Sequence, residues 1–355
     1  MIYLDYQATT PLAPEAFEAM LPWLREGFAN PHSAHAPGRA AKAAVEVARG
    51  QLLKLLPPGG LAFTSSATEA LNWAIKGTQG PIVTIATEHS AVLDSVAAEA
   101  ARGRAVTVLP VDAHGLVDLD TARAAIAPGT GLVVAMLVNN EVGVIQPIAA
   151  LAELTQTAGA KLLVDAVQGF GRVALPEADF IALSAHKIHG PKGIGALWFR
   201  NAPPAALLHG GGQEPERSGT LSPALCAGFG AAAKLAGGRF DEDAGHVERL
   251  FGIARQALGP DWTVNGSVER RYRGNLNLRR AGLDVARLIS ELRDIAFSAG
   301  SACASGSGRP SHVLRALGLS DTEARSSIRL GFGRYTREEE LMEAIERINA
   351  AAARQ

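Results

Sequence analysis

A lysine near the middle of the chain has neighbours that suit covalent chemistry. Lys187 follows the apolar run FIAL and lies in SAHKIHGPKG, between Ser184, His186 and a glycine-containing turn. A lysine amine at the end of a strand can form a Schiff base with a carbonyl compound, and nearby hydroxyl, imidazole and backbone donors can hold a phosphate. A lone lysine in a turn is more often a surface residue, so the interpretation depends on what other strand ends provide.

Two further polar sites follow apolar runs. Asp165 ends the run LLVD, where a buried carboxylate needs a cationic partner such as a protonated pyridine nitrogen. The segment FTSSATEA, residues 63–70, is typical of a turn that opens a helix, and its backbone N–H groups with the Thr68 hydroxyl suit a phosphate ester. Taken alone, Thr68 is more often an ordinary helix cap. Together the three strand ends predict pyridoxal 5'-phosphate as the cofactor.

The elements that would position these residues alternate along the chain. Short β-branched runs, which we predict as strands, occupy residues 61–64, 82–86, 106–109, 132–138, 162–165, 180–183 and 194–199. Helix-like stretches at 68–76, 91–102 and 148–158 separate several of them. This alternation predicts an α/β fold with a mainly parallel sheet covered on both faces. In such sheets ligands bind at the carboxyl ends of the strands.

From about residue 204 the pattern of predicted strands and helices changes. Helix-like segments alternate with short strands at 263–265 and 276–278, followed by SAGSACASGSG, the strand SSIRLGF and a final charged helix from Arg337. We therefore predict a large cofactor-binding domain over residues 15–240 and a smaller α+β domain made of residues 1–14 and 241–355.

Composition and charge exclude several classes of function. The 355 residues are 47% hydrophobic and carry 34 Lys and Arg against 35 Asp and Glu, a net charge of 34 − 35 = −1. Such a balance does not recruit nucleic acid or an anionic membrane. Two cysteines are too few for a disulfide framework, and the most apolar run, 132–138, is too short to span a membrane. We expect a soluble, cytoplasmic protein without a signal peptide.

Familiar nucleotide and hydrolase motifs are absent from the sequence. There is no complete G-x-G-x-x-G after a strand, no P-loop, no G-x-S-x-G and no H-E-x-x-H. The close histidine pairs, His32 with His35 and His186 with His189, lack carboxylates or thiols at ligand spacing, so we expect no metal site.

The motifs resemble the cysteine desulfurases of the nitrogen-fixation and iron–sulfur-assembly type, within the class-V aminotransferase family. The resemblance covers nearly the whole chain in ten ordered segments: YLDYQATTPL, NPHSAHAPGRAA, FTSSATEALN, EHSAVL, NNEVGVIQPI, DAVQ, SAHKIHGPKGIGALW, RSGT, SAGSACASGSGRPSHVLRALGL and SSIRLGFGRYT. It implies the fold of type I pyridoxal-phosphate-dependent transferases, whose large domain has a mainly parallel seven-stranded sheet.

The same resemblance implies roles for individual residues around the cofactor. Lys187 would bind it covalently, Asp165 would pair with its ring nitrogen and Gln168 would reach its phenolic oxygen. His89 would stack on the ring and belong to the catalytic residues, although it could simply cap the helix that follows. The phosphate would be held by Ala67, Thr68, Ser184 and His186 of this chain. Thr220 from the other subunit of a homodimer would contribute to the same site.

Asn140 and Arg329 resemble the residues that hold the substrate carboxylate. An arginine in the apolar strand SSIRLGF is costly unless it is paired, and a bidentate carboxylate is its best partner. A structural ion pair is the alternative explanation of Arg329.

The two cysteines receive different interpretations. Cys226, in the helix-like PALCAGFGAAAK, is typical of a small buried hydrophobe, whereas Cys303 lies among Ser, Ala and Gly. By the resemblance, Cys303 takes sulfur from L-cysteine as a persulfide and L-alanine is released. The sulfur would serve iron–sulfur cluster assembly or another sulfur-transfer pathway. Assembly-type relatives continue beyond the helix that ends this chain, so the acceptor protein is left open.

Three other functions fit parts of the same pattern. A lyase acting on selenocysteine or cystine would share the cofactor residues and depend less on Cys303. A non-catalytic regulator that binds the cofactor would need no reactive Lys187, but a basic helix-turn-helix segment is lacking. A plain aminotransferase would need no cysteine loop.

Overall fold

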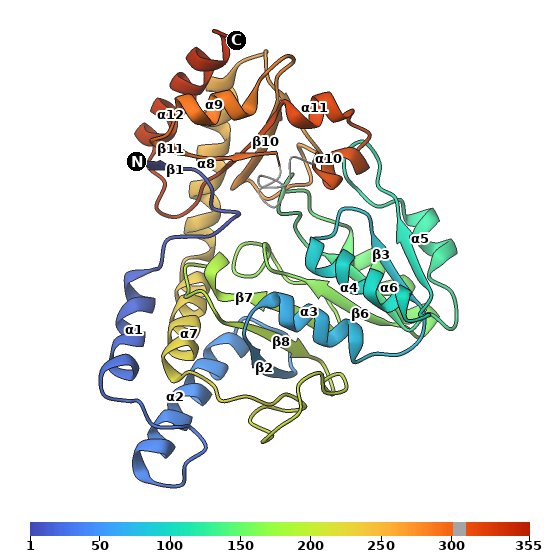
Figure 1. Cartoon of the computed structure of the whole chain (residues 1–355), viewed down its shortest axis with the longest axis vertical. Helices are drawn as coiled ribbons and strands as arrows, with labels where there is room; N and C mark the ends of the chain where they lie inside the picture. Colours follow the sequence, from blue (N-terminus) through green and yellow to red (C-terminus); the bar gives the residue numbers. More distant parts are fainter. Residues whose placement is uncertain (301–309) are drawn as a thin grey trace.

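The computed structural model describes residues 1–300 and 310–355, and a seven-stranded sheet forms its centre (Figure 1). The strands run in the order β2-β8-β7-β6-β5-β3-β4. β8 is antiparallel to both of its neighbours, and the other strands are parallel to one another. The strands of this sheet are β2 (Gly60–Thr64), β3 (Ile82–Ile85), β4 (Val106–Leu109), β5 (Leu132–Met136), β6 (Lys161–Asp165), β7 (Phe180–Ser184) and β8 (Gly195–Phe199).

Helices cover both faces of this sheet, because successive strand residues point to opposite sides. In β2, Ala62 packs in the cluster formed with α3 and α4, whereas Phe63 packs in the cluster formed with α2 and α7. The helices around the sheet are α1 (Pro14–Arg25), α2 (Ala36–Leu53), α3 (Ala67–Lys76), α4 (Ser90–Ala101), α5 (Leu119–Ala125), α6 (Ile148–Ala158) and α7 (Pro223–Gly238).

A second, four-stranded sheet lies beyond the carboxyl ends of the parallel strands, in the upper part of Figure 1. Its order is β12-β13-β10-β9, all antiparallel, and its core includes residues of α8, α9 and α12. β1 from the start of the chain pairs with β11 beside it. The elements of this part are β1 (Ile2–Tyr3), α8 (Phe240–Leu258), β9 (Thr263–Val264), β10 (Asn275–Arg279), α9 (Val285–Glu291), β11 (Ile295–Ala296), β12 (Ser298–Ala299), α10 (His312–Ala316), α11 (Asp321–Arg325), β13 (Ser327–Gly331) and α12 (Glu338–Ala352).

The fold class predicted from the sequence is confirmed. All seven predicted runs are strands of the large sheet, and α3, α4 and α6 lie within one residue of the predicted helices. Cys226 is fully buried in α7, as its interpretation as a packing residue requires. The domain boundaries remain a prediction. Among the described helices, none has the length and apolar character needed to cross a membrane.

Candidate active site

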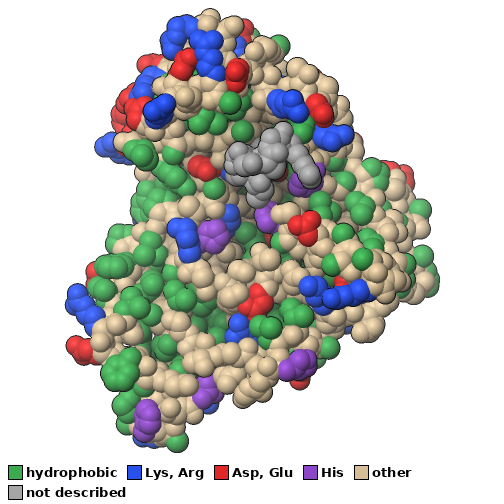
Figure 2. All heavy atoms as spheres, viewed as in Figure 1, with side chains coloured by type: hydrophobic (Ala, Val, Ile, Leu, Met, Phe, Trp, Pro, Cys, Tyr) green, Lys and Arg blue, Asp and Glu red, His purple; other side chains and the backbone are tan. Residues whose placement is uncertain are grey.

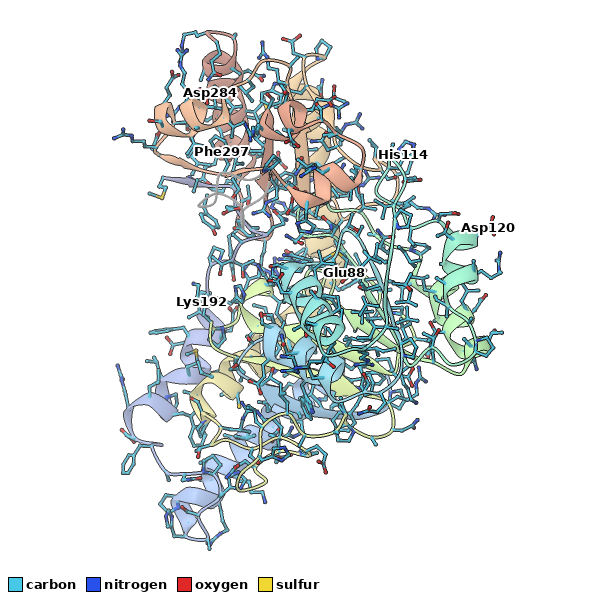
Figure 3. All side chains as sticks on the ribbon, turned by 45° about the vertical axis from the view of Figure 1, so that its right-hand side comes forward. Glu88, His114, Asp120, Lys192, Asp284 and Phe297 are labelled. Carbon is cyan, nitrogen blue, oxygen red and sulfur yellow. The ribbon has the colours of Figure 1, made fainter. Side chains whose placement is uncertain are left out.

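The largest set of predicted site residues meets in one cavity of about 880 Å³, including its open mouth. The cavity lies at the carboxyl ends of β2, β3, β5, β6 and β7, where the parallel arrangement brings all five strand ends to one edge. Glu88, labelled in Figure 3, is the third residue after β3 and lies near the junction of the two sheets. The predicted residues that line the cavity are Ala67, Thr68, His89, Asn140, Asp165, Gln168, Ser184, His186, Lys187 and Arg329.

Lys187 ends a short 3-10 turn, Ala185–Lys187, that follows β7. Its Nζ donates hydrogen bonds to the backbone carbonyls of Gln7 at 2.5 Å and Ala8 at 2.8 Å. Arg172 donates to the backbone carbonyl of Lys187. The amine is thus held at the cavity wall by a segment that lies 180 residues earlier in the sequence.

Asp165 is a buried carboxylate at the end of β6. Its Oδ1 accepts a hydrogen bond from the Val167 N–H at 2.9 Å, and its residue is only 4% exposed. Burial raises the pKa of Asp165, while the Val167 N–H and the charges of His89 and Lys187 lower it. A carboxylate in this setting favours a cation beside it.

A second acid, Glu88, is buried near Asp165. Its Oε1 accepts a hydrogen bond from the Met136 N–H at 2.6 Å, and Oε2 has no partner among the described residues. Burial and then the charge of Asp165 raise the pKa of Glu88 well above its ordinary value. The raised pKa favours the protonated form of Glu88 beside Asp165.

His89 serves as the N-cap of α4 and also lines the cavity. Its Nδ1 accepts a hydrogen bond from the Ala91 N–H at 3.1 Å, so the capping role considered from the sequence is realised. Burial is the largest influence and lowers the pKa of His89. The ring is thus fixed by its own helix, and a stacking role remains a prediction.

The start of α3 forms the cavity wall predicted to hold a phosphate. Its N-cap is Ser66, whose Oγ accepts from the Glu69 N–H at 3.3 Å, so the interpretation of Thr68 as the cap is wrong. Gly195 lets this helix start approach the sheet, since a Cβ there would lie 2.5 Å from the Ser66 carbonyl carbon and 2.7 Å from the Ala67 nitrogen. First-turn N–H groups that face a cavity favour an anion.

Ser184 and His186 approach the same wall from the end of β7. His186 Nδ1 lies 3.1 Å from Thr9 Oγ1, and the Thr10 hydroxyl donates to the His186 carbonyl at 2.9 Å. Burial, aided by the charges of Lys187, Lys192 and Arg172, lowers the pKa of His186 to about 4. The imidazole is therefore neutral near pH 7.

Gln168 and Thr220 differ in their relation to the cavity. Gln168 Nε2 donates to the Gln7 carbonyl at 2.9 Å, and its Oε1 accepts from Arg172 at 2.8 Å. Thr220 is exposed in the loop between β8 and α7 and does not line the cavity. Its assignment to the site of a partner subunit remains a prediction.

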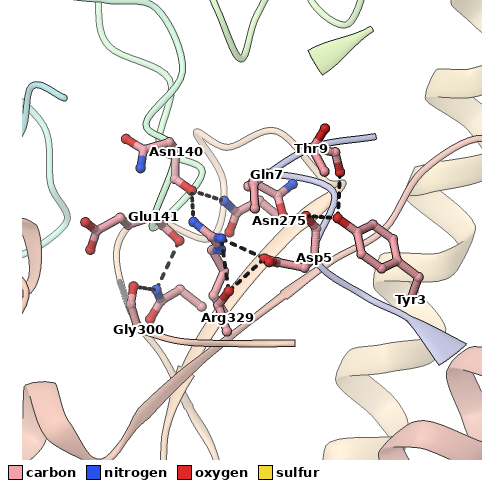
Figure 4. A network of polar contacts seen from close by, with 12 residues as sticks. Tyr3, Asp5, Gln7, Thr9, Asn140, Glu141, Asn275, Gly300 and Arg329 are labelled. Atoms are coloured by element: carbon pink, nitrogen blue, oxygen red, sulfur yellow. Dashed lines mark hydrogen bonds and ion pairs between the residues drawn. The ribbon is translucent and has the colours of Figure 1, made fainter. Parts of the chain in front are cut away.

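Arg329 reaches the cavity from β13 and is almost completely buried (Figure 4). Its Nη2 forms an ion pair with Asp5 at 2.7 Å, and Nη1 donates to the Asn140 carbonyl at 3.0 Å. Its Nε has no partner among the described residues. The structural ion pair considered from the sequence is thus present, and carboxylate binding would have to share the guanidinium with Asp5.

Cys303, the predicted nucleophile, lies outside the described residues. The described chain resumes at Pro310, and both flanks of the gap contact residues near the cavity. Gly300 accepts a hydrogen bond from Asn277, and Ser311 donates one to Glu141.

Sequence reasoning missed the contribution of the N-terminal segment and of two buried acids. Asp5, Gln7 and Ala8 contact Arg329, Lys187 and Gln168, yet nothing local links residue 7 to residue 187. The motif YLDYQATTPL was the available signal, because it belongs to the family pattern. Glu88 and Glu141 lie in EHSAVL and NNEV, and their complete burial was not readable from the sequence.

Comparison with known proteins agrees with this geometry. The family model described as "Aminotransferase class-V" matches residues 2–343. The chain belongs to the class-V aminotransferase family. It is 43% identical to "Cysteine desulfurase IscS" of Rickettsia bellii, across 98% of this chain and 90% of the relative. The family predicted from the sequence is therefore confirmed.

Solved structures give the same result for the fold. A NifS-like protein from Rickettsia africae is 31% identical, with a TM-score of 0.90 over 99% of both chains. A structure described as "SspA in complex with cysteine" is 32% identical, with a TM-score of 0.85 over 95% of this chain and 100% of that one. These likenesses confirm the predicted fold class over nearly the whole length of the chain.

Membership of this family implies dependence on pyridoxal phosphate, and the cavity has groups of the right kind. The buried Asp165 carboxylate suits a protonated ring nitrogen, and the start of α3 suits a phosphate. Within residues 1–300 and 310–355, no group of three or more His, Cys, Asp or Glu side chains is arranged to hold a metal ion.

Proposed function

We propose that this chain is a cysteine desulfurase that converts L-cysteine to L-alanine and keeps the sulfur as a persulfide on Cys303. The observation that carries the proposal is the meeting of Lys187 and Asp165 with Arg329 in one cavity, although they come from two different sheets. A lysine amine, a buried carboxylate and a guanidinium are the groups that an amino-acid-transforming cofactor enzyme requires.

The cofactor would be held by residues that line this cavity. Pyridoxal phosphate, when bound, supplies the electron sink that allows the Cα–H bond of an amino acid to break. Lys187 would bind it covalently and Asp165 would pair with its ring nitrogen, with His89 packed on the ring and Gln168 at its phenolic oxygen. The phosphate would contact Ala67, Thr68, Ser184 and His186, and Thr220 of the partner subunit.

The remaining steps belong to the chain's own side chains. Arg329 and Asn140 would hold the substrate carboxylate, and the Lys187 amine would remove the proton from Cα. The Cys303 thiolate then attacks the substrate sulfur, so that an S–S bond forms while the Cβ–S bond breaks. The electron pair of the broken bond stays on Cβ, which takes up a proton to give the methyl group of alanine, and the proton released when the Cys303 thiol became a thiolate balances this uptake. The two electrons lost by sulfur are those gained by carbon, so no further oxidant is needed.

A direct test is mass spectrometry of the holoenzyme after incubation with L-cysteine. We expect one added sulfur on the peptide that contains Cys303, together with an equal amount of L-alanine. The Cys303→Ala variant should keep the absorbance of the bound cofactor and form no persulfide. Full sulfide release by this variant would overturn the nucleophile assignment. Selenocysteine turnover that survives the substitution would favour the lyase alternative.

The proposal includes a homodimer, since Thr220 would act on the cavity of a second subunit. An exposed apolar area on α1 and the turn after it supports this. Phe17, Leu24 and Phe28 are 46%, 60% and 91% exposed there, and Figure 2 shows hydrophobic side chains around this lower left region. Light scattering of the holoenzyme should give twice the mass of one chain, and a monomer with full activity would contradict it. The sulfur-acceptor protein is left open.

A further inference from the structure

One buried glutamate is explained neither by the cavity nor by an ion pair. Glu141 is 2% exposed, does not line the cavity and has no ion-pair partner among residues 1–300 and 310–355. Burial raises its pKa, and the Ser311 hydroxyl is the main influence that lowers it. A carboxyl group is costly in such a place unless its hydrogen bonds are made.

The contacts of Glu141 lead to both flanks of residues 301–309, and Figure 4 shows the one at Gly300. Its carboxylate accepts a hydrogen bond from the Ser311 hydroxyl, on the C-terminal flank. Its backbone carbonyl accepts from Asn277 Nδ2 at 3.0 Å, and the same Nδ2 donates to the Gly300 carbonyl at 3.1 Å, on the N-terminal flank. The Glu141 side chain thus contacts the C-terminal flank directly, and its backbone carbonyl is linked to the N-terminal flank through Asn277.

Both flanks are also fixed independently of Glu141. The Gly300 N–H donates to the Ser327 carbonyl at 2.7 Å, which continues the pairing of β12 with β13. On the other flank, His312 Nε2 lies 2.9 Å from the Glu88 carbonyl, beside the end of β3. Glu141 therefore joins two surfaces that already have other supports.

Glu141 is also linked to the predicted substrate subsite. It directly follows Asn140, which lines the cavity and whose carbonyl accepts from Arg329. The Asn139 side chain fixes this turn, because its Oδ1 accepts from the Glu141 N–H at 2.8 Å. A shift of Glu141 would consequently change the flanks of the Cys303 segment relative to the carboxylate subsite.

We propose that Glu141 is a positioning residue, which ties Ser311 directly and Gly300 through Asn277 to the substrate subsite, and that the rate of sulfur transfer to Cys303 depends on these ties. The inference rests on the proposed function, because it assigns Glu141 to the sulfur-transfer step. Reactions between groups on one protein depend steeply on placement, and a misplacement of about 1 Å can cost about 100-fold in rate. Glu141 touches neither substrate nor cofactor in this role.

The experiment separates sulfur transfer from the earlier chemistry of the holoenzyme. Persulfide formation on Cys303 is followed by rapid quenching and mass spectrometry in a single turnover with L-cysteine. Exchange of the Cα proton of L-alanine in deuterium oxide, followed by NMR, needs the cofactor and Lys187 but no thiol. Glu141→Ala should slow persulfide formation by about 10- to 100-fold and change the exchange rate by less than about twofold. Glu141→Gln keeps an oxygen that accepts from Ser311 and should recover most of the rate.

A second pair of variants covers the case in which Glu141→Ala does not fold. Ser311→Ala removes the donor to Glu141 as well as the N-cap of α10, and Ser320→Ala removes only the N-cap of α11. Only Ser311→Ala should slow persulfide formation selectively.

Two results would overturn the inference. One is an equal loss of persulfide formation and proton exchange in Glu141→Ala, or in Ser311→Ala if that variant is used. The other is a persulfide rate unchanged from that of the unsubstituted protein. Absence of any persulfide in the unsubstituted holoenzyme is a different outcome, because it refutes the proposed function itself.

Discussion

The ion pair between Asp5 and Arg329 allows a quantitative prediction. The Arg329 side chain is 1% exposed and the Asp5 side chain 19%, and the pair is 2.7 Å long. Asp5→Asn keeps an oxygen that can accept from Arg329 and from Ser298, but it removes the negative charge. Removal of one partner of a buried ion pair typically costs about 3–5 kcal/mol, and the hydrogen bond that Asn keeps to the charged guanidinium retains about 1.5–3 kcal/mol of it. We therefore expect Asp5→Asn to lower the free energy of unfolding by about 1–2 kcal/mol.

The Asp5→Ala variant should lower the free energy of unfolding by more than Asp5→Asn. Asp5→Ala leaves the Arg329 charge buried without its partner, for which about 3–5 kcal/mol is typical. Urea unfolding of the holoenzyme near pH 7, followed by tryptophan fluorescence, measures both values. The matched control is Asp120→Asn, since Asp120 pairs with Arg123 at 2.6 Å while the two side chains are 87% and 64% exposed. This surface pair, with Asp120 labelled in Figure 3, should contribute less than about 1 kcal/mol. Equal, small effects at both positions would refute the reasoning that burial makes the Asp5 pair important.

Three other predictions follow from burial and close packing. Burial holds the pKa of His189 at about 4 against its ordinary 6.5, so its contribution to stability is complete above pH 6.5 and is lost as the pH falls towards 4. Between pH 4 and 6.5, His189→Gln should reduce the slope of the unfolding free energy against pH by the amount that corresponds to about one bound proton. An unchanged slope would contradict this. Burial also raises the pKa of Cys226 to about 12, so folded Cys303→Ala protein should resist iodoacetamide near pH ~8 until it is unfolded; rapid labelling of the folded protein would count against it. Gly195→Ala should weaken pyridoxal phosphate binding by about tenfold or more, measured by cofactor titration, because its Cβ would overlap the start of α3. Gly252→Ala, with open space around its Cβ, is the control, and equal affinity in the two variants would refute the packing argument.

The sequence was sufficient for the large sheet because its signals are local. Each strand is a short apolar run, Asp165 ends one of them and Lys187 lies three residues after another, so their meeting at one sheet edge could be predicted. Ser66 and Thr68 differ by two positions in one small-residue turn. The choice of cap between them depends on backbone direction, which the sequence does not express.

Long-range polar contacts are what the sequence could not provide. Gln7 reaches Lys187 only because β1 pairs with β11 and the following segment then crosses to the large sheet. Glu88 and Glu141 follow strands as ordinary charged residues would, and their burial results from neighbours distant in the chain. Contacts of this kind can be identified only from the assembled structure, in which the two sheets lie together.

The two sheets divide the proposed chemistry between them. Asp165 and Lys187 belong to the seven-stranded sheet, whereas Arg329 belongs to β13 and meets the large sheet through the Asn140 carbonyl. In β12, Ser298 pairs directly with Arg329 and leads within a few residues to Cys303. Under the proposed roles, the carboxylate subsite therefore belongs to the smaller sheet, and the cofactor residues belong to the larger one. Small displacements between the two sheets should therefore affect proton removal at Cα, because Arg329 would hold the substrate on one sheet and Lys187 would act from the other.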